Sequence, residues 1–108
     1  MKFQEISVSD VLKIRKLEIT ELEQAFPVIR QLRTHLSLGE YIALAKEMKS
    51  DGYQIVCLFE HDTVVSYIGF IKLKNLYYGE HIWVYDLVTE KAKQGRGYGK
   101  LLLSSIEK

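Results

Sequence analysis

The sequence predicts an α/β fold: a mixed, mostly antiparallel sheet with helices on both faces, in the order β-α-α-β-β-β-α. Three observations lead to this prediction. Two segments with helix-capping signals follow one short strand, two β-rich runs meet at a turn, and a last apolar strand leads through a glycine-rich turn into a leucine-rich helix. No repeat or linker interrupts these elements, so we treat residues 1–108 as a single domain.

The first strand and the first helix lie close together in the chain. Residues 13–19, KIRKLEI, form a short run of strand-like composition. Thr20 and Glu23 follow with the spacing of a capping box, in which two side chains bind backbone N–H groups at the start of a helix. This spacing predicts a helix over residues 21–33.

A second helix follows the first without an intervening strand. Ser37 and Glu40 repeat the capping-box spacing before residues 39–50. Gly52 comes shortly after them, and glycine is common just beyond the last helical residue. Two consecutive helices therefore separate the first strand from the rest of the sheet.

The central part of the chain predicts a hairpin. Residues 53–74 contain two β-rich runs joined by a turn over residues 60–63. The first run is apolar on both faces, which predicts a strand that is covered on both sides. One face carries Tyr53, Ile55, Cys57 and Phe59, and the other carries Val56 and Leu58. A loop over residues 75–80 and a strand over residues 81–88 complete the sheet.

Composition limits the classes of function. A chain of 108 residues that is 47% hydrophobic and 27% charged can bury a core, and its net charge of +1 gives no overall attraction to nucleic acid or membrane. Cys57 has no cysteine with which to form an internal disulfide, and no apolar run approaches a spanning helix or a signal-peptide core. We therefore expect a cytoplasmic protein in which Cys57 is an inert buried thiol. The histidines lack metal-ligand spacing, so no metal site is expected.

Residues 93–100, KQGRGYGK, place three glycines at alternate positions before the last helix. A dinucleotide-binding G-x-G-x-x-G counted from Gly95 would need a third glycine at Lys100. A phosphate-binding G-x-x-x-x-G-K-[ST] would need a glycine at Gln94 and a hydroxyl at Leu101. Neither motif fits, but glycines at a helix N-terminus can turn successive N–H groups inward as a cradle for a pyrophosphate. The alternative is a flexible turn between strand and helix.

Residues 85–103, YDLVTEKAKQGRGYGKLLL, resemble the acetyl-coenzyme A signature of the GNAT superfamily of N-acyltransferases. In that signature a central strand ends in [RQ]-x-x-G-x-[GA] and runs into a helix, and the order of the elements upstream is similar, so the resemblance spans about residues 13–108. It implies an N-acetyltransferase that transfers an acetyl group from acetyl-CoA to an amine of a small molecule or protein. The alternatives are a non-catalytic acyl-CoA-binding or regulatory module, and a phosphate cradle unrelated to coenzyme A.

The resemblance also implies which residues bind acetyl-CoA. Backbone amides of the glycine-rich turn would hold the pyrophosphate, with charge added by Arg96 or Lys100. The backbone at the end of the last strand would pair with the pantetheine arm and could polarise the thioester carbonyl. The implied binding residues are Leu87, Val88, Thr89, Gln94, Gly95, Arg96, Gly97, Tyr98, Gly99 and Lys100.

Asp86 is the candidate catalytic residue. On strict alternation it shares a face with Ile82, Val84 and Val88, where burial would raise its pKa and suit it to act as a general base toward the amine. The resemblance also implies an acidic residue near this position. The alternative is a hydrogen-bonded or surface carboxylate, because a bulge in the strand could turn Asp86 toward solvent.

Three further side chains are open to two interpretations. His35, between the two predicted helices, could line an acceptor pocket or be an ordinary loop histidine. Tyr77 and Tyr78 could flank an acceptor or cover the core. Nothing in the sequence names the acceptor.

The chain departs from the family after the last helix. Members ordinarily continue with a further strand, a helix carrying a tyrosine that protonates the leaving thiolate, and closing strands; residues 1–108 lack these, and neither Tyr85 nor Tyr98 takes the place of that tyrosine. The strand over residues 81–88 is thus expected to form an open apolar edge. We expect either a homodimer that covers this edge or a truncated form of a longer gene product.

Overall fold

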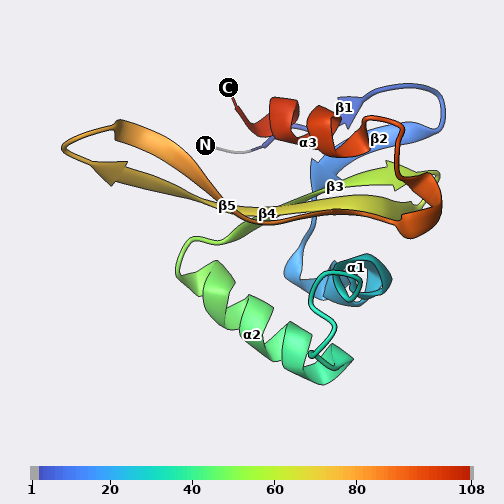
Figure 1. The fold of residues 1–108 in the computed structure, drawn as a ribbon, viewed down its shortest axis with the longest axis horizontal. Helices are drawn as coiled ribbons and strands as arrows, with labels where there is room; N and C mark the ends of the chain where they lie inside the picture. Colours follow the sequence, from blue (N-terminus) through green and yellow to red (C-terminus); the bar gives the residue numbers. More distant parts are fainter. Residues whose placement is uncertain (1–2, 108) are drawn as a thin grey trace.

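The computed structural model describes residues 3–107 and confirms the predicted fold class (Figure 1). Five strands form one sheet in the order β1-β2-β3-β4-β5, and each of the four pairings is antiparallel. The described sheet is therefore wholly antiparallel rather than mixed as predicted, and its first strand was not predicted. The strands are β1 (Ile6–Ser7), β2 (Leu12–Lys16), β3 (Gln54–Glu60), β4 (Thr63–Asn75) and β5 (Gly79–Thr89). The helices are α1 (Leu22–Ile29), α2 (Leu38–Ser50) and α3 (Tyr98–Ile106). Helices α1 and α2 cover one face of the sheet and α3 covers the other.

The sheet separates two hydrophobic clusters, and β3 contributes to both. The cluster on the side of α1 and α2 contains Ile55, Cys57 and Phe59 of β3 and Tyr53 just before it, whereas Val56 and Leu58 of β3 belong to the cluster beneath α3. The prediction that β3 is covered on both faces is therefore confirmed. No helix of residues 3–107 has both the length and the apolar character that crossing a membrane requires.

Helix α1 begins differently from the prediction. The carboxylate of Glu21 accepts a hydrogen bond from the backbone N–H of Glu18 at 2.9 Å and is held by two nitrogens of Arg15 at 2.9 and 2.8 Å. The capping box predicted from Thr20 and Glu23 is wrong. The observed box joins Glu18 and Glu21 at a short 3-10 helix, Ile19–Glu21, that precedes α1, and Arg15 on β2 holds the Glu21 carboxylate. The Arg15 hydrogen bonds lower the pKa of Glu21.

Helix α1 also ends four residues before the predicted end. The chain leaves the helix after Ile29, and two side chains of the following turn bind the end of β5. The amide of Gln31 donates to the carbonyl of Thr89 at 3.0 Å, and Arg33 reaches Asp86. Contacts distant in sequence therefore outweigh the local helical pattern here. The capping box of α2 is confirmed, with Ser37 and Glu40 each accepting a hydrogen bond from the other's backbone.

A β-bulge interrupts the pairing of β4 with β5. Asp86 pairs with Gly69, but the next pair is Val84 with Phe70, so Tyr85 is an extra residue. The bulge reverses the alternation, and the predicted common face of Asp86 with Ile82 and Val84 is wrong. Asp86 and Val88 face α1 and α2, whereas Ile82 packs into the cluster beneath α3.

The β4–β5 hairpin is longer than predicted and projects beyond the helices (Figure 1). Its turn consists of three residues, Leu76–Tyr78, and the side-chain oxygen of Asn75 accepts hydrogen bonds from the backbone N–H groups of Tyr77 and Tyr78 at 3.0 and 2.7 Å. Both tyrosines are exposed, so neither covers the core, and neither lines the pocket described below.

Gly69 on β4 leaves room for the side chain of Tyr53, the residue just before β3. A Cβ atom at Gly69 would overlap the hydroxyl oxygen of Tyr53 and lie 2.5 Å from its Cζ atom. Only glycine therefore allows the Tyr53 ring to cross β4 and reach Asp86.

We predict that Gly69→Ala lowers the free energy of unfolding by about 1–3 kcal/mol, the usual range for overpacking a well-packed core. Urea unfolding measures this change. Gly39→Ala is the matched control, because a Cβ atom on that helical glycine meets nothing within 4 Å. The control should stabilise the chain by about 0.5–1 kcal/mol, the cost of a glycine within a helix. Equal stability of Gly69→Ala and the wild type would contradict the packing argument.

Candidate active site

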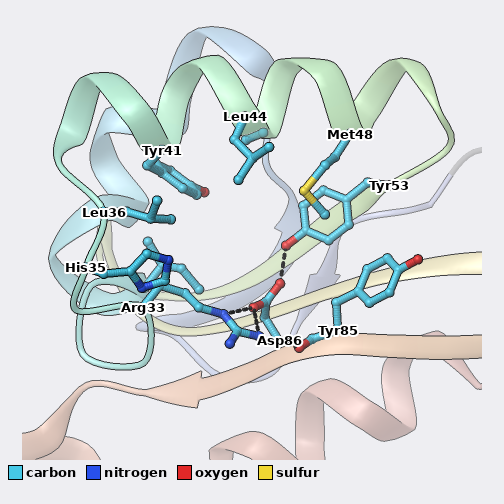
Figure 2. A pocket seen from close by; sticks show the side chains of 11 residues that line it. Arg33, His35, Leu36, Tyr41, Leu44, Met48, Tyr53, Tyr85 and Asp86 are labelled. Atoms are coloured by element: carbon cyan, nitrogen blue, oxygen red, sulfur yellow. Dashed lines mark hydrogen bonds and ion pairs between the residues drawn. The ribbon is translucent and has the colours of Figure 1, made fainter.

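A pocket of about 300 Å³ lies between α2, the loop after α1 and the bulged part of β5 (Figure 2). Its apolar lining comes from Ile29, Leu36, Leu44, Ala45 and Met48. Its polar and aromatic lining comes from Arg33, His35, Tyr41, Tyr53, Tyr85 and Asp86. Of the residues singled out in the sequence, the pocket brings together Asp86 and His35. No group of three or more His, Cys, Asp or Glu side chains in residues 3–107 is arranged to hold a metal ion.

Asp86 is buried and fully engaged on two sides. Its Oδ1 atom lies 2.8 Å from both Nε and Nη2 of Arg33, and its Oδ2 atom accepts a hydrogen bond from the hydroxyl of Tyr53 at 2.6 Å. A carboxylate has about four acceptor positions, so the hydrogen bonds from Arg33 and Tyr53 leave at least one for another donor. The sequence predicted burial among apolar side chains, but a cation and a hydroxyl surround the charged end of Asp86 instead.

Three tyrosine hydroxyls continue the contact from Asp86 toward α2. The hydroxyl of Tyr53 lies 3.1 Å from that of Tyr67, which lies 2.9 Å from that of Tyr41. Burial raises the pKa of all three hydroxyls, most strongly for Tyr67. This network was not predicted from the sequence. The signal was available, because a tyrosine on an apolar strand needs a partner for its hydroxyl when it is buried.

Arg33 was also missed, since the predicted helix over residues 21–33 placed it on a helix surface. In the structure its guanidinium binds β5 twice, because Nη2 also donates to the carbonyl of Tyr85 at 2.9 Å. Figure 2 shows Arg33 extending from the loop after α1 to the carboxylate of Asp86. The sequence separation of 53 residues explains why no local pattern indicated this pair.

The glycine-rich turn lies between the end of β5 and the start of α3. Gly95 and Gly97 have φ angles of 83° and 79°, in the left-handed region that favours glycine. Within residues 3–107, no hydrogen-bond acceptor meets the backbone N–H groups of residues 95–97, and the first N–H groups of α3 have no partner inside the helix. A Cβ atom on Gly95 or Gly97 would meet nothing within 4 Å, so these amides border open space.

The turn is anchored on the side away from that open space. The amide of Gln94 donates to the carbonyl of Thr89 at 3.2 Å, and the ammonium of Lys93 lies 3.0 Å from the carboxylate of Glu60. Gly99 faces the side chains of Leu87 and Thr89, which places the start of α3 over the end of β5. Arg96 and Lys100 are exposed, whereas Tyr98 packs against the cluster beneath α3.

The backbone of β5 alternates between its neighbour and the open edge. The carbonyl of Val88 accepts a hydrogen bond from the hydroxyl of Ser66, and the N–H of Glu90 donates to Val65, so these groups point toward β4. Since the pattern alternates along a strand, the N–H and C=O groups of Leu87 and Thr89 point away from β4. The outward backbone groups of Leu87 therefore directly follow Asp86 in the chain. The glycine-rich turn begins a few residues further on.

The chain belongs to the GNAT acetyltransferase family, since the model of that family matches residues 15–108. A protein named as an uncharacterized N-acetyltransferase, YhdJ of Bacillus subtilis (strain 168), is 31% identical over 84 residues. Those residues are 77% of this chain and 59% of the Bacillus protein, so the chain spans less than two thirds of that relative.

Solved structures of acetyltransferases share the fold. A GNAT family acetyltransferase from Staphylococcus aureus has a TM-score of 0.75 and 18% identity, with 87% of this chain and 73% of that chain covered. Glucosamine-6-phosphate N-acetyltransferase from Arabidopsis thaliana has a TM-score of 0.69 and 22% identity, with 88% and 71% covered. An aminoglycoside acetyltransferase from an uncultured soil metagenomic sample has a TM-score of 0.71 and 20% identity, with 92% and 69% covered.

We predict that the chain loses stability steeply in alkali because of the three buried tyrosines. Burial raises their folded-state pKa above the unfolded value of about 10, so their protons are retained in the folded chain and lost in the unfolded one. The stabilisation is complete below about pH 10 and falls above it by about 1.4 kcal/mol per pH unit for each tyrosine.

Urea unfolding between about pH 9 and about pH 12 measures this slope, with tyrosinate absorbance followed in parallel. Tyr67→Phe should reduce the slope by the contribution of one tyrosine. A stability that stays flat over this range would contradict the predicted pKa direction.

Proposed function

We propose that this chain is an acetyl-CoA-dependent N-acetyltransferase that transfers an acetyl group to an amine of a small molecule or protein. One observation carries the proposal. The last strand of the sheet presents the buried carboxylate of Asp86 and then the outward backbone of Leu87. It leads into a turn whose amides have no acceptor among the described residues 3–107. Base, thioester site and phosphate cradle thus follow one another along a single segment.

The residues present fit acetyl-CoA. Free N–H groups in the turn over residues 95–97, together with the N-terminus of α3, suit the pyrophosphate, and Arg96 and Lys100 add positive charge. The outward backbone groups of Leu87 and the N–H of Thr89 suit the pantetheine arm, which would pair with β5 as an added strand. The carbonyl of Thr89 already accepts hydrogen bonds from Gln31 and Gln94. Gln94 would contribute to acetyl-CoA binding by fixing the conformation of the turn. Val88, Tyr98 and Gly99 would contribute through the packing that holds the turn in place.

Asp86 acts as general base in this proposal. The acceptor amine donates a hydrogen bond to the remaining acceptor position of the carboxylate and passes one proton to it as the nitrogen attacks the acetyl carbon. The N–H of Leu87 stabilises the negative charge that develops on the carbonyl oxygen. The carbon–sulfur bond breaks, and the thiolate takes a proton from solvent.

We propose that residues 1–108 form one N-acetyltransferase-like domain. We place it in the cytoplasm, because its one cysteine, Cys57, is a free buried thiol suited to a reducing compartment. Its partners are acetyl-CoA and an amine. If two copies pair through the β5 edge, they would use residues 79–84, since Leu87 and Thr89 are assigned to pantetheine.

A non-catalytic acyl-CoA-binding module is the second candidate. The observation that favours it is the pairing of Asp86 with Arg33 and Tyr53, since a carboxylate with these partners also has a structural role. Acetyl-CoA binding without thiol release in the presence of amines would support this candidate over the enzyme.

We predict that acetyl-CoA raises the melting temperature of the chain and that Gly97→Val abolishes this shift, because a side chain there would project into the space assigned to the pyrophosphate. Gly79→Val is the matched control. Both glycines have positive φ angles, 79° and 70°, and neither has a neighbour within 4 Å of a Cβ atom, so the cost in backbone strain is similar. The control should keep the full shift. A shift retained in Gly97→Val would contradict the backbone cradle.

We predict that Asp86→Asn leaves acetyl-CoA binding intact and slows acetyl transfer by about 10²-fold or more, within the range of general-base catalysis. Thiol release at saturating acetyl-CoA measures the rate, and calorimetry measures binding. Tyr53→Phe is the control for lost hydrogen bonding, since it removes a partner of Asp86 and keeps the carboxylate. It should slow transfer far less. Similar losses in both variants would indicate that Asp86 acts structurally.

A further inference from the structure

The pocket beside Asp86 has an apolar half that faces α2. Leu44 and Met48 project into it from α2, opposite the polar wall formed by β5 (Figure 2). Leu44 is 44% exposed, although it borders a cavity of about 300 Å³, which is at the small end of ligand sites. This half of the pocket thus suits an apolar group of a few carbon atoms.

The polar half of the pocket holds charges of both signs. Asp86 is the one carboxylate in the lining, and it is already paired with Arg33, with His35 nearby. An acceptor with several ammonium groups would find no unpaired carboxylate, and desolvating those charges would be costly. The pocket therefore disfavours polyamines and aminoglycoside-like polycations.

The Arg33–Asp86 pair instead matches a ligand that carries both charges. One acceptor position of Asp86 is open to an ammonium. The side chain of Arg33 is 42% exposed, and its Nη1 atom has no acceptor within residues 3–107, so it is open to a carboxylate. An α-amino acid places its ammonium and carboxylate on neighbouring carbon atoms, as such a pair requires.

We infer that this pocket binds α-amino acids with apolar side chains about the size of leucine, methionine or phenylalanine. The ammonium lies at Asp86, the carboxylate at Arg33 with His35 beside it, and the side chain against Leu44 and Met48. The inference rests on the proposed function, because the bound amino acid is then the acetyl acceptor. The bound ammonium first loses one proton to solvent. The α-nitrogen of the resulting amine then forms the bond to the acetyl carbon and passes a second proton to Asp86. The carbon–sulfur bond breaks, and the thiolate takes a proton from solvent.

Binding without acetyl-CoA tests this inference directly. Calorimetry on the chain compares L-leucine with L-leucinamide, which lacks the carboxylate charge, and with 3-methylbutylamine, which lacks the carboxylate altogether. Leucine should bind at least ~10-fold more tightly than either analogue, the effect of a hydrogen bond between charged groups. Equal affinities, or no binding of leucine at millimolar concentration, would overturn the inference.

A filled pocket gives a second test. Leu44→Trp should weaken binding of leucine and phenylalanine at least ~10-fold and leave that of alanine within about twofold, since only the larger side chains need the apolar half. Leu32→Trp is the matched control, because Leu32 is similarly exposed, at 42%, but does not line the pocket. If the affinity for leucine is unchanged in Leu44→Trp, helix α2 does not contact the bound side chain and the inference is overturned.

Thiol release separates this inference from the proposed function. Leucine binding with no release of thiol from acetyl-CoA would keep the amino-acid pocket and overturn the proposed function. Release that is as fast with leucinamide or 3-methylbutylamine as with leucine would keep the function and overturn the amino-acid preference. The test is stringent, because the amine of leucinamide is less basic than that of leucine and is more readily deprotonated.

Discussion

The buried carboxylate of Asp86 is the constraint on which the rest of the site depends. A charge taken out of water costs several kcal/mol unless partners replace the solvent. Three departures from regular structure provide those partners. The bulge at Tyr85 turns Asp86 inward, Gly69 makes room for the hydroxyl of Tyr53, and the early end of α1 lets Arg33 reach β5. Each departure is unfavourable alone and is explained by the same carboxylate.

The features that the sequence predicted are those fixed by neighbouring residues. The capping box of Ser37 and Glu40 closes within one turn, and the two apolar faces of β3 follow from alternation along seven residues. The glycine-rich turn also lies within one short segment, where a strand ends and a helix begins. In such cases the local pattern and the tertiary structure agree, and the sequence alone is sufficient to predict the element.

The features that the sequence missed depend on residues far apart in the chain. The start of the first helix is an exception, because Thr20 and Glu23 had the spacing of a capping box, but Arg15, only six residues from Glu21, holds the Glu21 carboxylate instead. Strict alternation grouped Asp86 with Ile82 and Val84 as well as with Val88. Only the pairing with Val88 holds, because a single extra residue in β5 reverses the pattern beyond it. The pocket itself joins residues 29–53 with residues 85–86, so no window of the sequence contains it.

The row of tyrosine hydroxyls has a fixed polarity. Each hydroxyl has one proton to donate, and that of Tyr53 goes to Asp86. Tyr67 must then donate to Tyr53, and Tyr41 to Tyr67, so that three O–H dipoles point the same way across the core. Aligned dipoles strengthen one another. The charge of Asp86 on β5 therefore sets the direction of the O–H bond of Tyr41 on α2. It does so through the orientation of the intervening hydrogen atoms, without displacement of the backbone between them.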